Sequence, residues 1–145
     1  MEVYSGPVIA THQACRELVP GQRQFSDEQL REVIRRSGIV CVPCDAWMLH
    51  PNWIRGETSR EVVSIEALAD HVDHVCQLAG NPNHAAVGSD LDGGYGTEQT
   101  PSGLDSIADL QKLGHILDGR GYSEKDIRGI LGENALRFFL KHLPE

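Results

Sequence analysis

The sequence has little positive charge and no long apolar run, and these two absences exclude two classes of partner. Its 145 residues include 13 Lys and Arg against 21 Asp and Glu, which gives a net charge of −8 at pH 7. Proteins that bind a phosphate backbone concentrate Lys and Arg on one surface, so we expect no nucleic acid partner. No stretch approaches the ~20 apolar residues of a membrane-spanning helix, so we expect no membrane span.

Cysteine is also scarce, and its distribution bears on the compartment of the protein. The chain has 4 cysteines, too few and too scattered for a disulfide scaffold in a chain of this length: Cys15, Cys41, Cys44 and Cys76. The start, MEVYSGPVIATH, lacks the basic and apolar regions of a signal peptide. We therefore expect a cytoplasmic protein from the chain as it stands, while export of a longer form stays open. A C-x-x-C zinc site would need a second Cys pair, which the sequence lacks.

The apolar residues that are present predict one α/β domain over residues 1–145. They make up 40% of the chain, enough for one core, and the composition does not shift along it. Short apolar runs at 7–11, 38–42 and 85–89 are typical of strands buried on both faces of a parallel sheet. Larger α/β sheets and barrels contain more strands than these, so the pattern predicts part of such an architecture.

Helices are expected between and after these strands. Ser26 with Gln29 forms a capping box at the start of one helix, and a second helix runs from about Ser64 to Gly80. An apolar stripe supports the second helix: Ile65, Leu68, Val72, Val75 and Ala79. The rest of the chain predicts helices over 104–117, 123–131 and 133–143, with Asn134 as a cap. Strands that alternate with helices imply right-handed crossovers and parallel pairing.

Three polar side chains are expected to meet where the predicted strands end. His12 follows the first strand and Asp90 follows the third, in AAVGSDLDGGYG. Parallel strands bring both to the same carboxyl edge, where α/β folds keep their sites. Arg23 lies in the loop VPGQRQF and can reach over this edge. A histidine, an arginine and a carboxylate together predict a site, although Asp and Gly at a strand end are also typical of an ordinary turn.

Most of the chain resembles a known family. The segments are GPVIATHQACREL, FSDEQLREVIRRSGIV, IEALADHVDHVCQLAG, AAVGSDLDGG, GLDSIADLQKLGHIL and GYSEKDIRGILGENALRFF. In this order they resemble the C-terminal half of the membrane (renal) dipeptidase family of zinc peptidases. The resemblance implies part of a TIM (β/α)8 barrel with about three parallel strands, crossover helices and a helical C-terminus. It also implies a zinc-dependent dipeptidase that acts on dipeptides, often with a D-residue on the C-terminal side.

The resemblance assigns roles to the three polar residues. His12 matches a histidine that binds one of a pair of zinc ions, and Arg23 matches the arginine that holds the terminal carboxylate of the substrate. Asp90 matches a carboxylate that contacts substrate and transfers a proton. Imidazole is a standard zinc ligand, and a guanidinium binds a carboxylate through paired hydrogen bonds. Asp92 is then the turn residue.

The remaining zinc ligands of the family precede the part that this chain resembles. They are a His-x-Asp pair, a glutamate that bridges the ions and a second histidine. We therefore expect the N-terminal metal-binding half to be absent, and the chain to be inactive alone, with self-association or a separate N-terminal half covering its open edges. Two alternatives stay open: a noncatalytic interaction module that needs a partner chain, and another metal hydrolase of the amidohydrolase type.

Other candidate residues have structural explanations. His71 and His74 could present two imidazoles from one helix, but they flank its apolar stripe, so we favour a structural role. Trp47 and Trp53 lie in a segment that departs from the family, PCDAWMLHPNWIRGETSREVV. They could line a substrate pocket or cover the mouth of a barrel.

Overall fold

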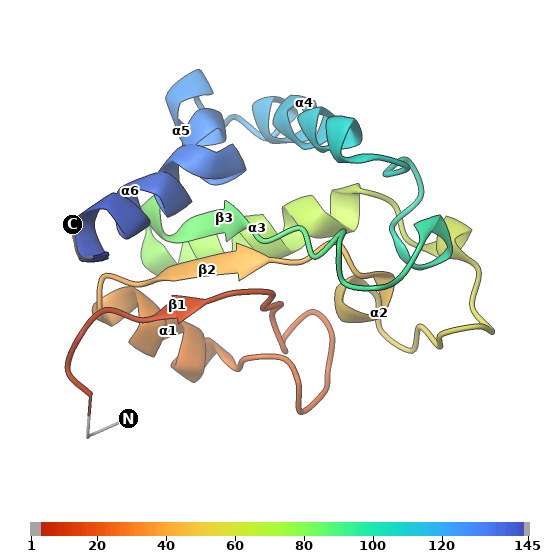
Figure 1. The fold of residues 1–145 in the computed structure, drawn as a ribbon, viewed down its shortest axis with the longest axis horizontal. Helices are drawn as coiled ribbons and strands as arrows, with labels where there is room; N and C mark the ends of the chain where they lie inside the picture. The colour runs from red at the N-terminus through yellow and green to blue at the C-terminus, as the bar shows by residue number, and fades with distance from the viewer. Residues whose placement is uncertain (1–3, 144–145) are drawn as a thin grey trace.

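A three-stranded parallel sheet forms the centre of the computed structural model, which describes residues 4–143. Residues 1–3 and 144–145 of the predicted domain lie outside the described residues. The strands are β1 (Ile9–Ala10), β2 (Ile39–Val42) and β3 (Ala85–Val87), in the order β1-β2-β3 (Figure 1). The predicted strands and their parallel pairing are thus confirmed, although each strand is shorter than its apolar run.

The register of the sheet brings the strand ends to one edge. Ile9 pairs with Ile39, and Cys41 pairs with Ala86. The chain then leaves β1 and β3 at this edge, and the amide of Gln13 still donates to the Cys41 carbonyl over 2.9 Å. Short strands in parallel register therefore place the segments after β1, β2 and β3 next to each other.

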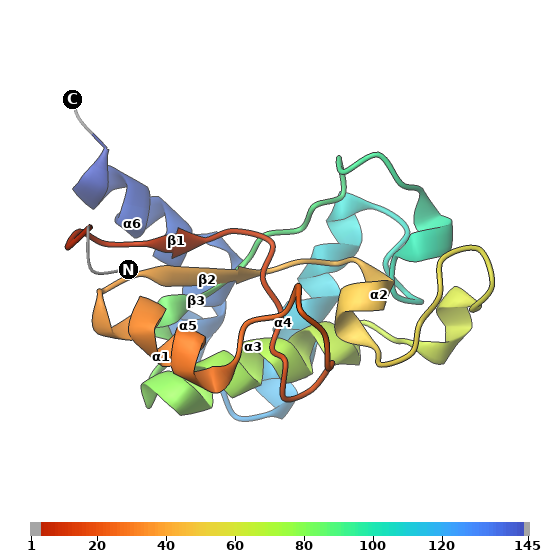
Figure 2. The ribbon, with the colours of Figure 1, turned by 90° about the horizontal axis from the view of Figure 1, so that it is seen from below.

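Two helices cover one face of the sheet. Along the chain, helix α1 (Asp27–Arg35) follows β1, and α3 (Glu66–Ala79) follows β2. Both helices lie on the same side of the strands in Figure 2. The capping box of Ser26 and Gln29 is present, and α3 ends at Gly80, whose φ of 68° only glycine adopts freely. Both helices bury apolar residues against the sheet: Leu30, Val33, Leu68, Val72 and Val75 contribute to one core with Val40 and Val42.

The segment between β2 and α3 is irregular. It contains α2 (Ala46–Leu49) and a 3₁₀ turn at Arg60–Val62, and 3₁₀ turns of the same length occur later in the chain at Pro82–His84 and Thr97–Gln99. Trp53 is buried in the main core with an exposed fraction of 7%. It therefore stabilises this segment from within and does not line an open pocket.

The C-terminal part is helical, as predicted, but its helices begin and end at other residues. They are α4 (Gln111–Gly119), α5 (Glu124–Arg128) and α6 (Asn134–His142). A 3₁₀ turn over Ile107–Leu110 precedes α4, because the Ser106 amide and hydroxyl both bond to the Asp109 carboxylate and start the helix there. Residues 104–106 of the predicted helix are therefore not helical. A π-helical turn, Gly129–Glu133, connects α5 to α6.

The predicted capping role of Asn134 is wrong. Asn134 is buried, and its amide nitrogen donates to the carbonyls of Pro82 and Ala85, each over 2.8 Å. Its amide oxygen accepts from Arg137. Because buried carbonyls need donors, this side chain ties α6 to the amino end of β3 instead of capping its own helix.

The second face of the sheet is small and packs against α6. Ile39, Cys41 and Ala86 form this cluster, and Ala135 and Phe138 of α6 lie against it. No helix in residues 4–143 is both long and apolar enough to cross a membrane.

Candidate functional site

His12 and Asp90 meet at the carboxyl edge of the sheet, as predicted. Their backbones have φ values of 51° and 58°, in the left-handed region that residues other than glycine seldom adopt. The sharp turn at each strand end aims both side chains at each other, with His12 Nε2 3.8 Å from Asp90 Oδ1. This separation exceeds a hydrogen bond, so neither side chain satisfies the other. Backbone strain of this kind is often found at functional sites.

The two aspartates of this segment lie in different surroundings. Asp90 begins a turn in which the Gly93 amide donates to the Asp90 carbonyl over 2.9 Å. A Cβ atom on Gly93 would lie 2.7 Å from Asp90 Oδ1, so glycine is needed to leave room for the carboxylate. Asp92 lies within the turn and is exposed, whereas the side chain of Asp90 is only 31% exposed.

Arg23 reaches the same edge, also as predicted. Its Nη2 donates to the carbonyl of His12 over 2.8 Å, and its Nη1 donates to the side-chain oxygen of Gln13 over 2.9 Å. Arg23 is exposed, and it forms no ion pair with any described carboxylate. Its positive charge and its remaining N–H donors are therefore available to an anion.

Asp45 is a residue at this edge that sequence reasoning missed. It follows β2, is 4% exposed, and its Oδ2 accepts from Trp47 Nε1 over 2.6 Å and from Gln99 Nε2 over 2.7 Å. Burial raises its pKa, and the bonds from Gln99 and Trp47 oppose this rise. The signal was present, because Asp45 follows the second strand much as His12 and Asp90 follow the other two.

Tyr95 was also missed, and its hydroxyl group is buried. No described residue provides a hydrogen-bond partner for this oxygen. Burial raises the pKa of Tyr95 above its usual range, and the charges of Asp45 and Asp90 raise it further. The phenol is therefore neutral and its O–H is available as a donor near the strand ends.

A cavity of about 490 Å³ adjoins the turn that carries Asp90. Much of its lining is apolar or weakly polar, such as Leu91, Tyr95, Leu104 and Ile107, but Asp92 and Asp105 also line it. Cavities of this size are within the range of small-molecule sites.

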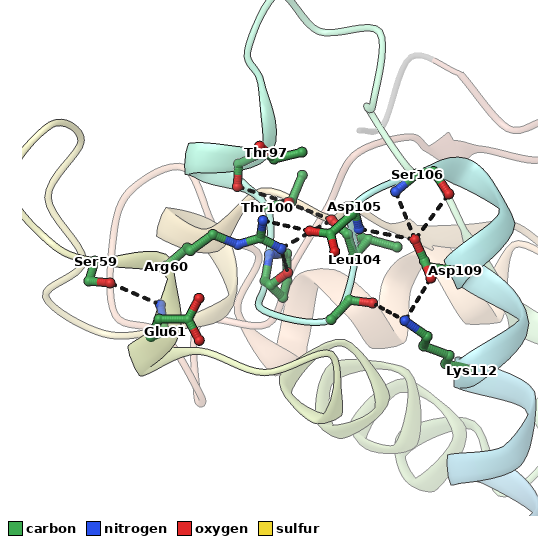
Figure 3. Close-up of polar contacts among 12 residues, drawn as sticks. Ser59, Arg60, Glu61, Thr97, Thr100, Leu104, Asp105, Ser106, Asp109 and Lys112 are labelled. Carbon is green, nitrogen blue, oxygen red and sulfur yellow. Dashed lines mark hydrogen bonds and ion pairs between the residues drawn. The ribbon is translucent and has the colours of Figure 1, made fainter.

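Arg60 holds the 100–105 loop, part of which lines this cavity, and Figure 3 shows its contacts. Its Nη1 bonds to Asp105 Oδ1, and its Nη2 bonds to the carbonyl of Pro101, each over 2.7 Å. The Thr100 hydroxyl donates to the carbonyl of Leu104 over 2.7 Å. These bonds close the 100–105 loop on itself and tie it to the 3₁₀ turn at Arg60–Val62.

The two histidines of α3 are engaged in separate contacts. His71 is 1% exposed, and its Nδ1 accepts from the Cys15 amide over 3.0 Å. His74 Nε2 lies 2.7 Å from Asp27 Oδ1, at the start of α1. Each imidazole thus joins α3 to a neighbouring segment, which agrees with the structural role that we favoured.

The cysteine thiols are buried and free. Cys41 belongs to the face under α6 and Cys44 to the main core, and burial raises their pKa values to about 11 and about 12. Thiols of such high pKa are poor nucleophiles and poor metal ligands at neutral pH.

The residues present do not by themselves fit a zinc ion. Among the described residues, no group of three or more His, Cys, Asp or Glu side chains could hold a metal. His12 and Asp90 offer one donor group each, whereas a catalytic zinc normally takes about three protein ligands. His12 and Asp90 alone are therefore too few to hold a zinc ion.

The parallel sheet and the polar residues at its carboxyl edge define an α/β protein with a strand-end site, and comparison with known proteins gives its family. The sequence profile of membrane dipeptidases (peptidase family M19) matches residues 1–142. Dipeptidase verJ of Clonostachys rogersoniana is 31% identical over 137 residues, which are 94% of this chain and 32% of that protein. Dipeptidase 3 of Homo sapiens is 29% identical over 139 residues, which are 96% of this chain and 26% of that protein.

Solved structures agree with this assignment. A metallopeptidase from Rhodobacter sphaeroides, crystallised with a phosphinate mimic of the dipeptide L-Ala-D-Ala, has a TM-score of 0.77 at 27% identity. The match covers 92% of this chain and 35% of that one. The probable dipeptidase PvdM from Pseudomonas aeruginosa has a TM-score of 0.79 at 19% identity, covers 94% and 45% of the two chains, and shows the shared fold alone.

The chain belongs to the membrane dipeptidase family, as its sequence segments predicted. It spans about a third or less of the curated relatives it matches, 32% of one and 26% of the other. The family is one of metallopeptidases, so a metal is implied for the complete site.

Proposed function

We propose that this chain forms part of the TIM barrel of a zinc-dependent dipeptidase and supplies the residues that bind and protonate the substrate. The observation that carries the proposal is the convergence of His12, Arg23 and Asp90 at one edge of the sheet. Their backbones come from two different strand ends and one loop, yet His12 lies 3.8 Å from Asp90, and Arg23 bonds to the His12 carbonyl. An ordinary turn after a strand would not need a histidine from a second strand end or an arginine beside it.

Arg23 is proposed to bind the terminal carboxylate of a dipeptide. Neutral oxygens hold its guanidinium, so an incoming carboxylate meets an uncompensated positive charge. Two parallel N–H to oxygen bonds give such a pair both strength and orientation. This contact would exist before and during the reaction, so Arg23→Ala should raise KM by about 30-fold or more, with a smaller effect on kcat.

Asp90 is proposed to hold and transfer the proton at the scissile peptide. Its carboxylate is partly exposed and has no hydrogen-bond donor among the described residues, which leaves both oxygens free for substrate. A carboxylate in this position can accept a proton from a nucleophile and deliver it to the leaving amine.

His12 is proposed as one zinc ligand, with the other ligands supplied from outside these residues. A zinc ion held there by His12 and those further ligands would supply Lewis-acid chemistry for peptide hydrolysis. The cavity next to Asp90 offers room for a substrate side chain.

An exposed apolar stripe on α6 supports the proposal that further polypeptide packs against this chain. Its members recur at helical spacing and are 40% to 75% exposed: Leu136, Phe139, Leu140 and Leu143. Soluble proteins seldom leave such a stripe open to water. We propose self-association, or docking of an N-terminal half, as the way in which it is covered.

A chimera tests the proposed function. This chain would replace the matching part of the Rhodobacter sphaeroides metallopeptidase, and hydrolysis of L-Ala-D-Ala and bound zinc would be measured. We expect zinc binding and hydrolysis, and we expect loss of zinc from the His12→Ala variant. The isolated chain should show no hydrolysis with added zinc. A folded, zinc-loaded chimera without activity towards any dipeptide would contradict the proposal and favour a noncatalytic module.

A further inference from the structure

Gln13 is buried next to two of the candidate site residues, His12 and Arg23. Only 2% of its surface is exposed. Its backbone amide bonds to the Cys41 carbonyl over 2.9 Å, which fixes Gln13 to the end of β2. A buried amide side chain must find partners for its oxygen and its N–H groups.

Both ends of this amide contact Arg23. The Gln13 oxygen accepts from Arg23 Nη1 over 2.9 Å, and Gln13 Nε2 donates to the Arg23 carbonyl over 3.0 Å. The same nitrogen also donates to the Ala14 carbonyl over 3.2 Å. One side chain therefore fixes the backbone of Arg23 and the direction of its guanidinium.

This arrangement lowers the entropic cost of binding an anion. A free arginine side chain loses rotamer entropy when it is immobilised. Here Gln13 and the His12 carbonyl impose that loss on folding, before any ligand arrives. Preorganisation of this kind increases affinity without a new contact.

The neutrality of the amide is as relevant as its shape. A glutamate at position 13 could accept the same bond from Arg23 but would neutralise the guanidinium. A substrate carboxylate would then compete with a carboxylate already in place. Gln13 orients the arginine and leaves its charge unpaired.

We propose that Gln13 is the positioning residue that presents the unpaired Arg23 guanidinium to the carboxylate of a substrate. This inference rests on the proposed role of Arg23 in the same site. Gln13 itself does not touch the substrate, so its effect should be on affinity and not on the chemical step.

Titration of the ¹⁵N-labelled full chain with acetate tests the inference, with the Arg23 Nε–Hε resonance as the readout. We expect a saturable shift in the wild type and an affinity at least about tenfold lower in Gln13→Glu, because the introduced carboxylate occupies Arg23. Gln22→Glu is the matched control, because Gln22 is exposed and adjacent to Arg23. Gln22→Glu makes the same change in net charge as Gln13→Glu. Its affinity for acetate should stay within about threefold of the wild-type value.

A second variant covers the case in which Gln13→Glu does not fold. Gln13→Met keeps a similar volume but loses both amide contacts, so acetate affinity should fall about threefold to tenfold. In the chimera, Gln13→Glu should raise KM for L-Ala-D-Ala and leave kcat within about twofold. A residue that only stabilised the loop would change the fraction of folded protein and not the affinity of the folded form.

The outcomes separate the two proposals. If Arg23 of the wild-type chain does not respond to acetate, the proposed role of Arg23 fails and this inference fails with it. If the wild type binds acetate and Gln13→Glu or Gln13→Met binds it equally well, Gln13 is not the positioning residue, while the role of Arg23 stands.

Discussion

His12 at the carboxyl edge of the sheet and His71 in the layer of helices beneath it differ in exposure, in backbone conformation and in hydrogen bonding. His12 at the edge has a side chain that is 39% exposed and a strained backbone, and its ring lies too far from Asp90 for a hydrogen bond. His71 in α3 is 1% exposed, and its ring accepts a bond from the Cys15 amide. The edge thus leaves the His12 and Asp90 side chains without a hydrogen bond to each other on a strained backbone, whereas the helix layer buries His71 and bonds its Nδ1, although its Nε2 finds no partner among the described residues. Substitutions at the edge should therefore change activity, and substitutions in the helix layer should change stability.

The largest expected effect is at the edge, in a chimera with a complete site. Asp90→Asn keeps the shape of the side chain but loses its charge and its proton acceptor, so kcat should fall about 10² to 10⁴-fold. Asp92→Asn, which alters the exposed aspartate of the same turn, should change kcat by less than about threefold. Steady-state kinetics check both variants. Equal losses would show that the turn as a whole, and not Asp90, supports catalysis.

In the helix layer, His71→Ala should destabilise the protein by about 3 to 5 kcal/mol, because it leaves a cavity and an unpaired Cys15 amide. His12→Ala removes an exposed ring and should cost less than about 1 kcal/mol. Urea unfolding followed by circular dichroism measures both free energies. A comparable loss for His12→Ala would mean that the edge is also a structural region.

Acid should weaken the helix layer through the same histidine. Burial lowers the pKa of His71 from 6.5 to about 4. Between these two pH values, His71 is protonated in the unfolded chain but not in the folded chain. His71 therefore favours the folded state above pH 6.5, and this contribution to the free energy of unfolding is lost as the pH falls to about 4.

The lowered pKa of His71 corresponds to about 3 kcal/mol in the free energy of unfolding. His71→Asn keeps a short acceptor without a titrating group, so its free energy of unfolding should depend less on pH between 5 and 6.5. Unfolding curves of the two proteins across this interval measure the difference. Identical slopes would mean that His71 is not the titrating group.

The smallest expected effect lies at the junction of the two regions, where α1 begins directly after the loop of Arg23. Ser26→Ala removes the hydroxyl that accepts from the Gln29 amide and should cost about 1 kcal/mol. Ser26→Asp keeps an acceptor and should restore most of the loss. The same unfolding assay applies, and a full loss in Ser26→Asp would rule out capping as the cause.

Local signals in the sequence predicted most of the helix layer and the three residues of the edge. Ser26 and Gln29 are close in sequence, and Gly80 ends α3 by a property of its own backbone. Parallel pairing of apolar strands was sufficient to bring His12 and Asp90 together. These features depend on short-range chemistry or on a general rule of α/β topology.

The contacts that the sequence did not predict join residues far apart in the chain. Gln99 reaches Asp45 from 54 positions away, and nothing near Asp45 indicates that its carboxylate is buried. Asn134 is typical of a helix cap, but its amide donates to the carbonyls of Ala85, the first residue of β3, and of Pro82, 49 and 52 positions away. Such bonds depend on how the elements dock, which local propensity does not determine.

The contact of Asn134 also has a mechanical consequence for Asp90. Strand β3 is anchored at its start, where Asn134 bonds to Ala85, and beyond its end, where the Cys44 amide bonds to the Ser89 carbonyl over 3.0 Å. A short segment held at both ends has little freedom to move along its length. Removal of α6 would take away the first anchor, so the position of Asp90 would then depend on the Cys44–Ser89 bond and on the pairing of β3 with β2.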